Sequence, residues 1–179
     1  MREYETLRHV FEPVYDGDSR VLILGTFPSV RSRETGFYYG HPRNRFWKVL
    51  ESVCTDDEEL RSALLDDKTE SSLRTVEEKK RFLLENRIAI WDVIAQCDIA
   101  GSSDSSIRSV VPTDLNRILD HAQIRAVCAN GAKARELYMK YSYEITKREI
   151  IKLPSTSPAN AAFRMQKLTE HWSMIREYL

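Results

Sequence analysis

One stretch of the chain, residues 25–47, gathers most of the side chains that could do chemistry. It follows the apolar run 21–24 and contains two adjacent tyrosines, a His-Pro step, an asparagine and four arginines. A buried strand that ends in small residues would place these groups at its carboxyl end, where open α/β sheets form ligand crevices. Aromatic faces, amides and cations together suit a pocket for a nucleobase on a phosphate backbone.

The rest of the chain supplies elements that can position this segment. Apolar runs alternate with amphipathic or charged stretches, and runs that are apolar on both faces are typical of a parallel sheet covered on both sides. The sequence therefore predicts an α/β fold, a three-layer α/β/α sandwich with a central, mainly parallel four-stranded sheet, in a single domain spanning 1–179. We expect strands over 20–26, 88–93, 124–128 and 149–153, loops over 66–72 and 101–106, and helices over 44–53, 57–66, 75–86, 132–141 and 162–179.

Charge is balanced over the whole chain but unevenly distributed. The 27 Lys and Arg residues equal the 27 Asp and Glu residues, which argues against a polycation of the histone type. Residues 29–48 carry five cations and one carboxylate, whereas residues 51–67 carry seven carboxylates and one cation. The basic segment therefore coincides with the aromatic one. A solvated charged surface is the alternative interpretation for any single arginine.

Cysteine usage and hydropathy exclude several classes of protein. The three cysteines, Cys54, Cys97 and Cys128, are widely spaced and form no C-x-x-C pair, so we expect no metal site and no disulfide framework. The chain has neither an apolar leader nor a long apolar run. We therefore expect an intracellular, cytoplasmic protein with no membrane contact. We also expect a monomer that needs no cofactor.

Three motifs resemble the uracil-DNA glycosylase superfamily. The first is Gly25-Thr26-Phe27-Pro28 followed by the segment 38–47, Tyr-Tyr-Gly-His-Pro-Arg-Asn-Arg-Phe-Trp. The others are residues 90–93 with the loop 101–106, and the segment 153–160, Leu-Pro-Ser-Thr-Ser-Pro-Ala-Asn. The nearest branch is that of the deoxyinosine (hypoxanthine) DNA glycosylases, which is related to the mismatch-specific uracil/thymine glycosylases. All three motifs follow expected strands, so one crevice can collect them.

The resemblance implies a base pocket made of Gly25, Thr26, Phe27, Tyr38, Tyr39 and His41. Tyr39 occupies the position where these families stack a ring on the extruded base, although Tyr38 can serve instead and a Tyr-Tyr pair can also be ordinary half-buried surface. His41 suits a phosphate or sugar contact or a structural hydrogen bond. Phe27 departs from the mismatch-specific enzymes, which have an asparagine there to position the attacking water, and this departure favours the deoxyinosine branch.

Two residues are candidates for catalysis, Asn44 and Asp104. The Asn44 amide can donate and accept, which suits holding a purine edge or orienting a water. It can also cap a helix that starts at Arg45, and the two roles are compatible. Asp104 and Asp92 are the carboxylates nearest the expected crevice, where either can steady an oxocarbenium-like sugar or activate water. Asp104 can equally fix a serine-rich turn.

The segment 153–160 resembles the superfamily loop that presses into the DNA minor groove and supports the flipped nucleotide. Contacts to DNA are accordingly expected from residues in this loop and in the basic segment, namely Arg31, Arg43, Arg45, Ser155, Thr156, Ser157 and Asn160.

The resulting functional hypothesis is a monofunctional DNA glycosylase acting on DNA that contains deaminated bases, above all hypoxanthine in deoxyinosine. It would flip the base and hydrolyse the N-glycosidic bond with water. A uracil/thymine mismatch glycosylase is one alternative. A non-catalytic DNA damage-binding module and a small-molecule-binding α/β domain are alternatives of another class.

Overall fold

The computed structural model describes residues 4–100 and 104–179. Its centre is an all-parallel sheet in the order β3-β2-β6-β7. Every residue of β2 and β3 is buried, which explains why both strands read as continuous apolar runs. The strands are β2 (Val21–Gly25), β3 (Ile88–Asp92), β6 (Ala126–Asn130) and β7 (Ile150–Leu153).

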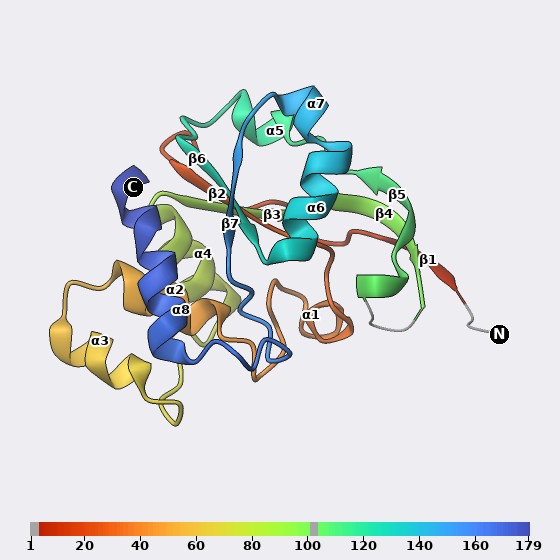
Figure 1. Cartoon of the computed structure of the whole chain (residues 1–179). Helices are drawn as coiled ribbons and strands as arrows, with labels where there is room; N and C mark the ends of the chain where they lie inside the picture. Colours follow the sequence, from red (N-terminus) through yellow and green to blue (C-terminus); the bar gives the residue numbers. More distant parts are fainter. Residues whose placement is uncertain (1–3, 101–103) are drawn as a thin grey trace.

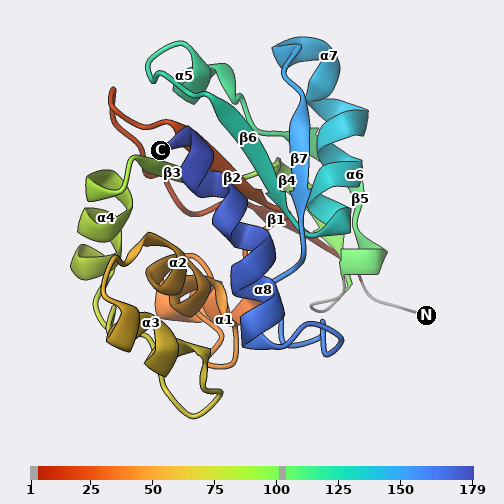
Figure 2. The same ribbon diagram turned by 60° about the vertical axis from the view of Figure 1, so that its left-hand side comes forward.

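Helices cover this sheet on both sides (Figures 1 and 2). One side carries α2 (Phe46–Cys54), α3 (Glu58–Leu65), α4 (Val76–Glu85) and α8 (Met165–Trp172) with the 3₁₀ helix η2 (Ser173–Tyr178). The other side carries α6 (Ala132–Tyr141) and α7 (Tyr143–Thr146). The short helix α1 (Val30–Thr35) lies at the carboxyl ends of the strands, and α5 (Asn116–Leu119) lies at their amino ends (Figure 1). The α/β sandwich with a parallel four-stranded sheet is therefore confirmed.

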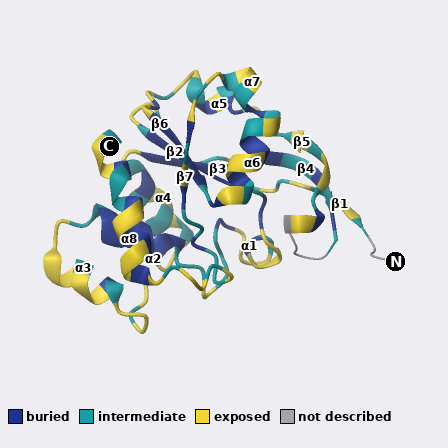
Figure 3. Ribbon diagram, in the orientation of Figure 1, coloured by how far each residue is buried: buried dark blue, intermediate teal, exposed yellow. Residues whose placement is uncertain are grey.

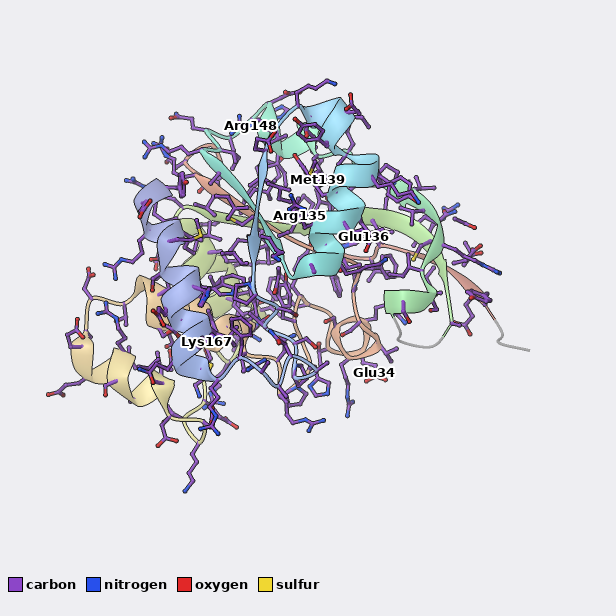
Figure 4. The ribbon with its side chains drawn as sticks, viewed as in Figure 1. Glu34, Arg135, Glu136, Met139, Arg148 and Lys167 are labelled. Atoms are coloured by element: carbon purple, nitrogen blue, oxygen red, sulfur yellow. The ribbon has the colours of Figure 1, made fainter. Side chains whose placement is uncertain are left out.

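Burial follows this layering. The central strands and most of α2 are buried, whereas α3 is largely exposed (Figure 3). On α6 the residues Ala134, Leu137 and Tyr138 are buried. Arg135 and Glu136, labelled in Figure 4, lie on its exposed side. This helix is thus amphipathic, and its apolar side packs against the sheet.

The sequence analysis did not predict a second sheet, which is antiparallel and ordered β1-β4-β5. It consists of β1 (Glu5–Arg8), β4 (Ile94–Ile99) and β5 (Arg108–Pro112), with the 3₁₀ helix η1 (Asp104–Ser106) before β5. Only Val93 separates β3 from β4, so the chain passes directly from the parallel sheet into the antiparallel one. The expected loop 101–106 lies partly outside the described residues.

Two helix ends differ from expectation. The helix expected over 44–53 begins at Phe46, two residues later. The helix expected over 162–179 begins at Met165, ends at Trp172 and continues as η2. At that transition the Ser173 hydroxyl donates to the carbonyl of Thr169 at 2.7 Å. Such side-chain bonding to the preceding turn competes with the α-helical ladder. None of the described helices has the length and apolar character needed to cross a membrane.

Candidate active site

The strand order creates a topological switch point between β2 and β6. The chain crosses from β2 to β3 on one side, whereas β6 pairs with the other side of β2. In open α/β sheets ligands bind at such points, outside the carboxyl ends of the strands. A cavity of about 150 Å³ lies there. Its walls come from all four strand ends, with residues 25–29 after β2, Asp92 of β3, Asn130 of β6 and residues 155–157 after β7, together with Tyr38, Tyr39 and Asn44.

This cavity brings together most of the residues expected in a base pocket. Gly25, Thr26, Phe27, Tyr38 and Tyr39 line it, as do Asn44, Ser155, Thr156 and Ser157. His41 instead lines a neighbouring groove, and its Nδ1 accepts the backbone N–H of Arg43 at 3.1 Å. A cavity of this volume accepts a benzene-sized ring. It therefore suits a single aromatic ring or the leading ring of a purine.

The Asn44 amide is held in one orientation by two donors. Its Oδ1 accepts the backbone N–H of Phe46 at 3.0 Å and the hydroxyl of Thr156 at 2.9 Å. A backbone N–H can only donate, so the amide oxygen must face Phe46. Among the described residues Nδ2 has no hydrogen-bond partner. Asn44 therefore accepts at the first turn of α2 with its oxygen, and its NH₂ group makes no hydrogen bond with the described residues.

Thr156 and Asn130 form a reciprocal clamp behind Asn44. The Asn130 amide donates through Nδ2 to the Thr156 hydroxyl at 2.9 Å, and its Oδ1 accepts the Thr156 backbone N–H at 3.0 Å. The Thr156 hydroxyl is fully buried and donates a hydrogen bond to Asn44 Oδ1. The expected contact of Thr156 with DNA is therefore replaced by an internal one, because the hydroxyl is enclosed and used.

Asn130 was not selected by the sequence analysis. It closes the apolar strand β6 and precedes Gly131, whose φ of 98° lies in the left-handed region. A polar residue at the end of a buried strand, followed by a glycine that turns the chain, was the signal available. Applied to every expected strand, the same signal would also have favoured Asp92 over Asp104 as the candidate carboxylate.

The two tyrosines lie in different environments. The ring of Tyr38 is buried and its hydroxyl donates to the carbonyl of Glu12 at 2.9 Å, so this side chain belongs to the packing. The ring of Tyr39 stacks on Phe46 with centroids 3.7 Å apart and planes 18° apart. Phe46 thus covers one face of Tyr39. A stack of the flipped base on Tyr39 stays a prediction.

The Tyr39 hydroxyl is buried at the cavity and makes no well-formed hydrogen bond with the described residues. Burial, and next the charge of Asp92, raise the pKa of Tyr39 far above its ordinary value, while the nearby amide of Asn130 opposes the rise. The phenol is therefore neutral at physiological pH and can donate a hydrogen bond to a ligand.

Asp92 forms a buried pair with His9, a residue that the sequence analysis also missed. The His9 Nε2 and Asp92 Oδ2 atoms are 2.7 Å apart, and the two side chains are only 5% and 6% exposed. The backbone N–H of Phe11 donates to His9 Nδ1 at 3.1 Å. His9 follows β1, so the end of this strand places the imidazole against Asp92, which lines the cavity.

Gly25 leaves the space that this arrangement needs. A Cβ atom at this position would lie 2.3 Å from Asp92 Oδ1 and 3.0 Å from the Tyr39 hydroxyl. Any side chain there would displace both groups. The glycine that ends β2 is thus explained by a close approach of Asp92 and Tyr39, and its own carbonyl accepts the backbone N–H of Val93 at 2.9 Å.

Comparison with known proteins identifies the family. The model of the uracil DNA glycosylase superfamily matches residues 12–179. The chain belongs to this superfamily. It is 32% identical over 174 residues to a hypoxanthine DNA glycosylase of Methanosarcina acetivorans, covering 95% of this chain and 99% of the relative. A hypoxanthine DNA glycosylase of Methanosarcina barkeri is 32% identical over 127 residues, covering 70% and 72%.

A solved structure supports the same assignment. The solution NMR structure of a candidate uracil DNA glycosylase from Methanosarcina acetivorans matches with a TM-score of 0.72 and 30% sequence identity. The match covers 96% of each chain. The superfamily fold therefore extends over nearly the whole molecule.

Phe27 stands at the position where the mismatch-specific uracil/thymine glycosylases of this superfamily have an asparagine. Phe27 is 9% exposed and lines the cavity. Its ring meets His9 edge-on, with centroids 6.0 Å apart and planes 88° apart. The side chain thus shapes the pocket and packs on His9.

Arg45 has a different role from the predicted DNA contact. Its guanidinium donates to the carbonyls of Thr156, Ser157, Asn160 and Phe163, and its own backbone N–H donates to Thr156 O at 3.1 Å. Burial lowers the pKa of this guanidinium, a change that the charge of Asp67 opposes. Arg45 is therefore a cross-link between the start of α2 and the loop that precedes α8.

The other expected DNA contacts lie on the surface around the cavity. Arg31 pairs with Glu34 of α1 at 2.8 Å, and Figure 4 shows Glu34 at the outer side of that helix. Arg43 is exposed, and its side chain has no partner among the described residues. Ser155 and Ser157 are partly exposed at the rim, whereas Asn160 donates to the Ser155 carbonyl at 2.9 Å and braces the loop.

A groove of about 680 Å³ adjoins the cavity and shares Tyr39 and Asn44 with it. The segment 67–74 closes its far wall, so residues that are remote from the basic segment in the sequence add to its charge. Two carboxylates line the groove, Asp67 and Glu70, against six cations, Arg43, Arg45, Lys48, Lys68, Arg74 and Lys79.

The remaining predictions concern Asp104 and metal binding. Asp104 begins η1, and its side chain lies outside what the structure describes, so its role stays a prediction. Within residues 4–100 and 104–179 no cluster of three or more His, Cys, Asp or Glu side chains is arranged to hold a metal ion. Cys97 and Cys128 are buried and Cys54 is half-buried.

Proposed function

We propose that this protein is a monofunctional DNA glycosylase that removes deaminated bases from DNA, with hypoxanthine in deoxyinosine as its principal substrate. The single observation that carries the proposal is the ring-sized cavity at the switch point, into which a fixed Asn44 presents an amide NH₂ group. The names of the two relatives support hypoxanthine as the base.

Base extrusion accounts for the shape of the site. A base inside a duplex cannot reach a cavity bounded by strand ends, so the nucleotide must be flipped out of the helix. The adjoining groove, with its six cations, offers a path for the phosphate backbone on either side of the flipped nucleotide. We propose that Ser155 and Ser157, which line the cavity at its rim, contact that backbone.

The orientation of Asn44 supports a donor role for its amide in the reaction. Both acceptor sites of Oδ1 are used by Phe46 and Thr156, so the amide does not hold the attacking water through its oxygen. Its NH₂ group instead donates to a carbonyl or ring nitrogen of the base. Such a bond strengthens as negative charge develops on the leaving base, which stabilises the transition state for glycosidic cleavage.

Water is the nucleophile in this proposal. The described residues that line the cavity include no lysine and no cysteine that could attack the sugar. The Asp104 carboxylate is our candidate for water activation or for stabilising the cationic sugar. The chain is proposed to act as a monomer and without a cofactor.

Uracil is the second candidate base. The cavity volume of about 150 Å³ suits a single six-membered ring, which favours a pyrimidine. Phe27 argues against uracil, because it has no amide. The mismatch-specific enzymes use an asparagine at this position to position the attacking water.

The test is a panel of single-stranded and duplex oligonucleotides, each carrying hypoxanthine, uracil, xanthine or a mismatched thymine. Abasic-site formation is scored by strand cleavage after alkali. Excision of hypoxanthine at the highest single-turnover rate supports the proposal. Tight binding of such DNA without any abasic-site formation would instead identify a damage-binding module, and the absence of DNA binding would favour a small-molecule site.

A further inference from the structure

We propose that Asp92 reads the ring N–H group that deamination creates on a base, and that His9 is the positioning residue that aims the Asp92 carboxylate. The inference rests on the proposed function and names the feature by which the cavity distinguishes a deaminated base from the undamaged base that gave rise to it. It starts from the hydrogen bonds around His9.

The tautomer of His9 follows from its two contacts. Nδ1 accepts the backbone N–H of Phe11, so Nδ1 carries a lone pair. A neutral imidazole with a lone pair on Nδ1 has its proton on Nε2. The Nε2–H group therefore donates to Asp92 Oδ2 across 2.7 Å. One oxygen of Asp92 is thereby engaged and the carboxylate is held as an acceptor.

The imidazole ring is itself fixed by packing. Aromatic rings surround it at centroid distances between 5.8 and 6.5 Å, and three of the four meet it nearly edge-on. They are Phe11, Phe27, Tyr38 and Trp91. His9 cannot rotate without displacing several of these rings, so the direction of its Nε2–H bond is set by the core.

The second oxygen of Asp92 is left for a ligand. Asp92 lines the cavity, and its Oδ1 atom has no hydrogen-bond partner among the described residues. Oδ1 is also the atom that a Cβ at Gly25 would meet at 2.3 Å, so the glycine keeps open the space beside it. The floor of the cavity thus presents an acceptor with no bound hydrogen, in a low-dielectric setting where such a group requires a donor.

Deamination supplies that donor. Adenine has a bare N1 and cytosine a bare N3, and both are hydrogen-bond acceptors. Their deaminated products, hypoxanthine and uracil, carry a hydrogen on the same ring nitrogen. A carboxylate oxygen aimed at that atom attracts the N–H of the damaged base and repels the lone pair of the parent base. A site that hydrogen-bonds a polar group rejects an analogue lacking it far more strongly than an apolar pocket rejects a change of size.

The experiment compares the parent protein with Asp92→Asn, which has nearly the same shape. In this variant the amide oxygen faces the His9 Nε2–H group, so the NH₂ group replaces Oδ1 at the cavity. Single-turnover excision is measured on deoxyinosine, deoxyadenosine and N1-methyldeoxyinosine in the same sequence. Asp18→Asn, an exposed residue of the same type remote from the cavity, is the matched control.

We expect Asp92→Asn to reduce the ratio of deoxyinosine to deoxyadenosine excision by about a hundredfold, the scale of a hydrogen bond to a charged acceptor. The preference for deoxyinosine over the N1-methyl analogue should shrink as well. Because the methyl group is equally bulky in both proteins, a change in this second ratio reports on the hydrogen bond alone. Asp18→Asn should leave both ratios unchanged.

His9→Phe keeps an aromatic ring against its neighbours but removes the Nε2–H donor. It should lower the same base-selectivity ratio, whereas a purely structural role for His9 would change the melting temperature and leave the ratio intact. His9→Gln, which retains a donor, should restore part of the selectivity.

Binding separates this inference from the proposed function. DNA carrying 2′-fluorinated deoxyinosine resists hydrolysis, so its affinity can be compared with that of the 2′-fluorinated adenosine counterpart without catalysis. If the parent protein prefers the inosine form and Asp92→Asn does not, the inference stands even where excision fails. Unchanged ratios and affinities in a folded Asp92→Asn protein that still excises hypoxanthine would overturn the role of Asp92 and leave the glycosylase intact. If Asp92→Asn does not fold, equal binding of the two bases by the parent protein overturns it instead.

Discussion

The hydroxyl of Thr156 donates to Oδ1 of Asn44 at 2.9 Å, joining two residues that are 112 positions apart in the chain. With the backbone N–H of Phe46 as the second donor, this bond occupies the amide oxygen. It determines which half of the Asn44 amide meets a bound base. The loop after β7 therefore fixes the orientation of a side chain in the loop between α1 and α2.

Asn44→Asp tests this donor role. A carboxylate oxygen accepts from Phe46 and Thr156 as the amide does, so the melting temperature should stay close to that of the parent. The NH₂ donor is lost and a charge is added beside the base, so single-turnover excision of hypoxanthine should fall about a hundredfold. A stable variant that cleaves at the parental rate would remove Asn44 from the mechanism and direct attention to Asp104.

Base preference gives a second prediction. Because Phe27 packs on His9 and has no amide to position water, hypoxanthine should be released clearly faster than uracil. The measurement is single-turnover cleavage of matched duplexes under identical conditions. Faster cleavage of uracil would place the protein functionally with the mismatch-specific enzymes.

Arg43 and Arg45 should behave differently when each is changed to alanine. Arg43 is exposed with no partner among the described residues, so Arg43→Ala should weaken DNA binding and reduce the salt slope of the affinity by about one. Arg45→Ala leaves several carbonyls of the 156–163 loop without a donor and should cost about 2 kcal/mol of unfolding free energy. Fluorescence titrations at several salt concentrations and urea unfolding measure the two effects. An Arg45→Ala protein of parental stability would show that the guanidinium contacts contribute little.

Tyr39 allows packing and base stacking to be separated. Its ring stacks on Phe46 and its buried hydroxyl lacks a well-formed hydrogen bond. Tyr39→Phe should therefore keep parental stability or gain about 1 kcal/mol, whereas Tyr39→Ala should lose about 3 kcal/mol. Thermal unfolding checks both values. If Tyr39→Ala melted like the parent and yet failed to excise the base, the ring would act on the substrate alone.

Alkaline pH should destabilise the fold through two thiols. Burial raises the pKa of Cys54 and of Cys128 to about 12, compared with 9.0 for an ordinary thiol. Between these values the unfolded thiols ionise while the folded ones stay protonated, so stability is fully present below about pH 9 and is lost as the pH rises toward about 12. Urea unfolding at pH 8 and pH 10 measures this loss, which Cys128→Ala should reduce. An identical pH dependence in that variant would show that Cys128 does not contribute.

The parallel sheet could be predicted from the sequence because its strands are short runs that are apolar on both faces. The residues of β4 and β5 gave no such signal, since β4 alternates between buried and half-buried positions and β5 has a mostly exposed pattern. Their pairing depends on partners far along the chain and on an irregular register between them. Tertiary context, more than local propensity, forms such strands.

The residues of the candidate site likewise fall into those that could be predicted from the sequence and those that could not. Asn44, Phe27 and Tyr39 stand in a contiguous motif whose residue types suggested a pocket. His9 could not be found in this manner, because its role depends on a hydrogen bond to Asp92, 83 positions away. Arg45 and Thr156 were expected to contact DNA, and their hydrogen bonds to the chain itself could be seen only once the loops were in place.

The pairing of β1 with β4 has a consequence for biosynthesis. Strand β1 can pair only after residues 94–99 have been synthesised, and Asn44 can be clamped only after Thr156 has been synthesised. Pairings of such long sequence separation slow folding. A chain that stops before Thr156 would consequently lack the hydrogen bond that orients the Asn44 amide.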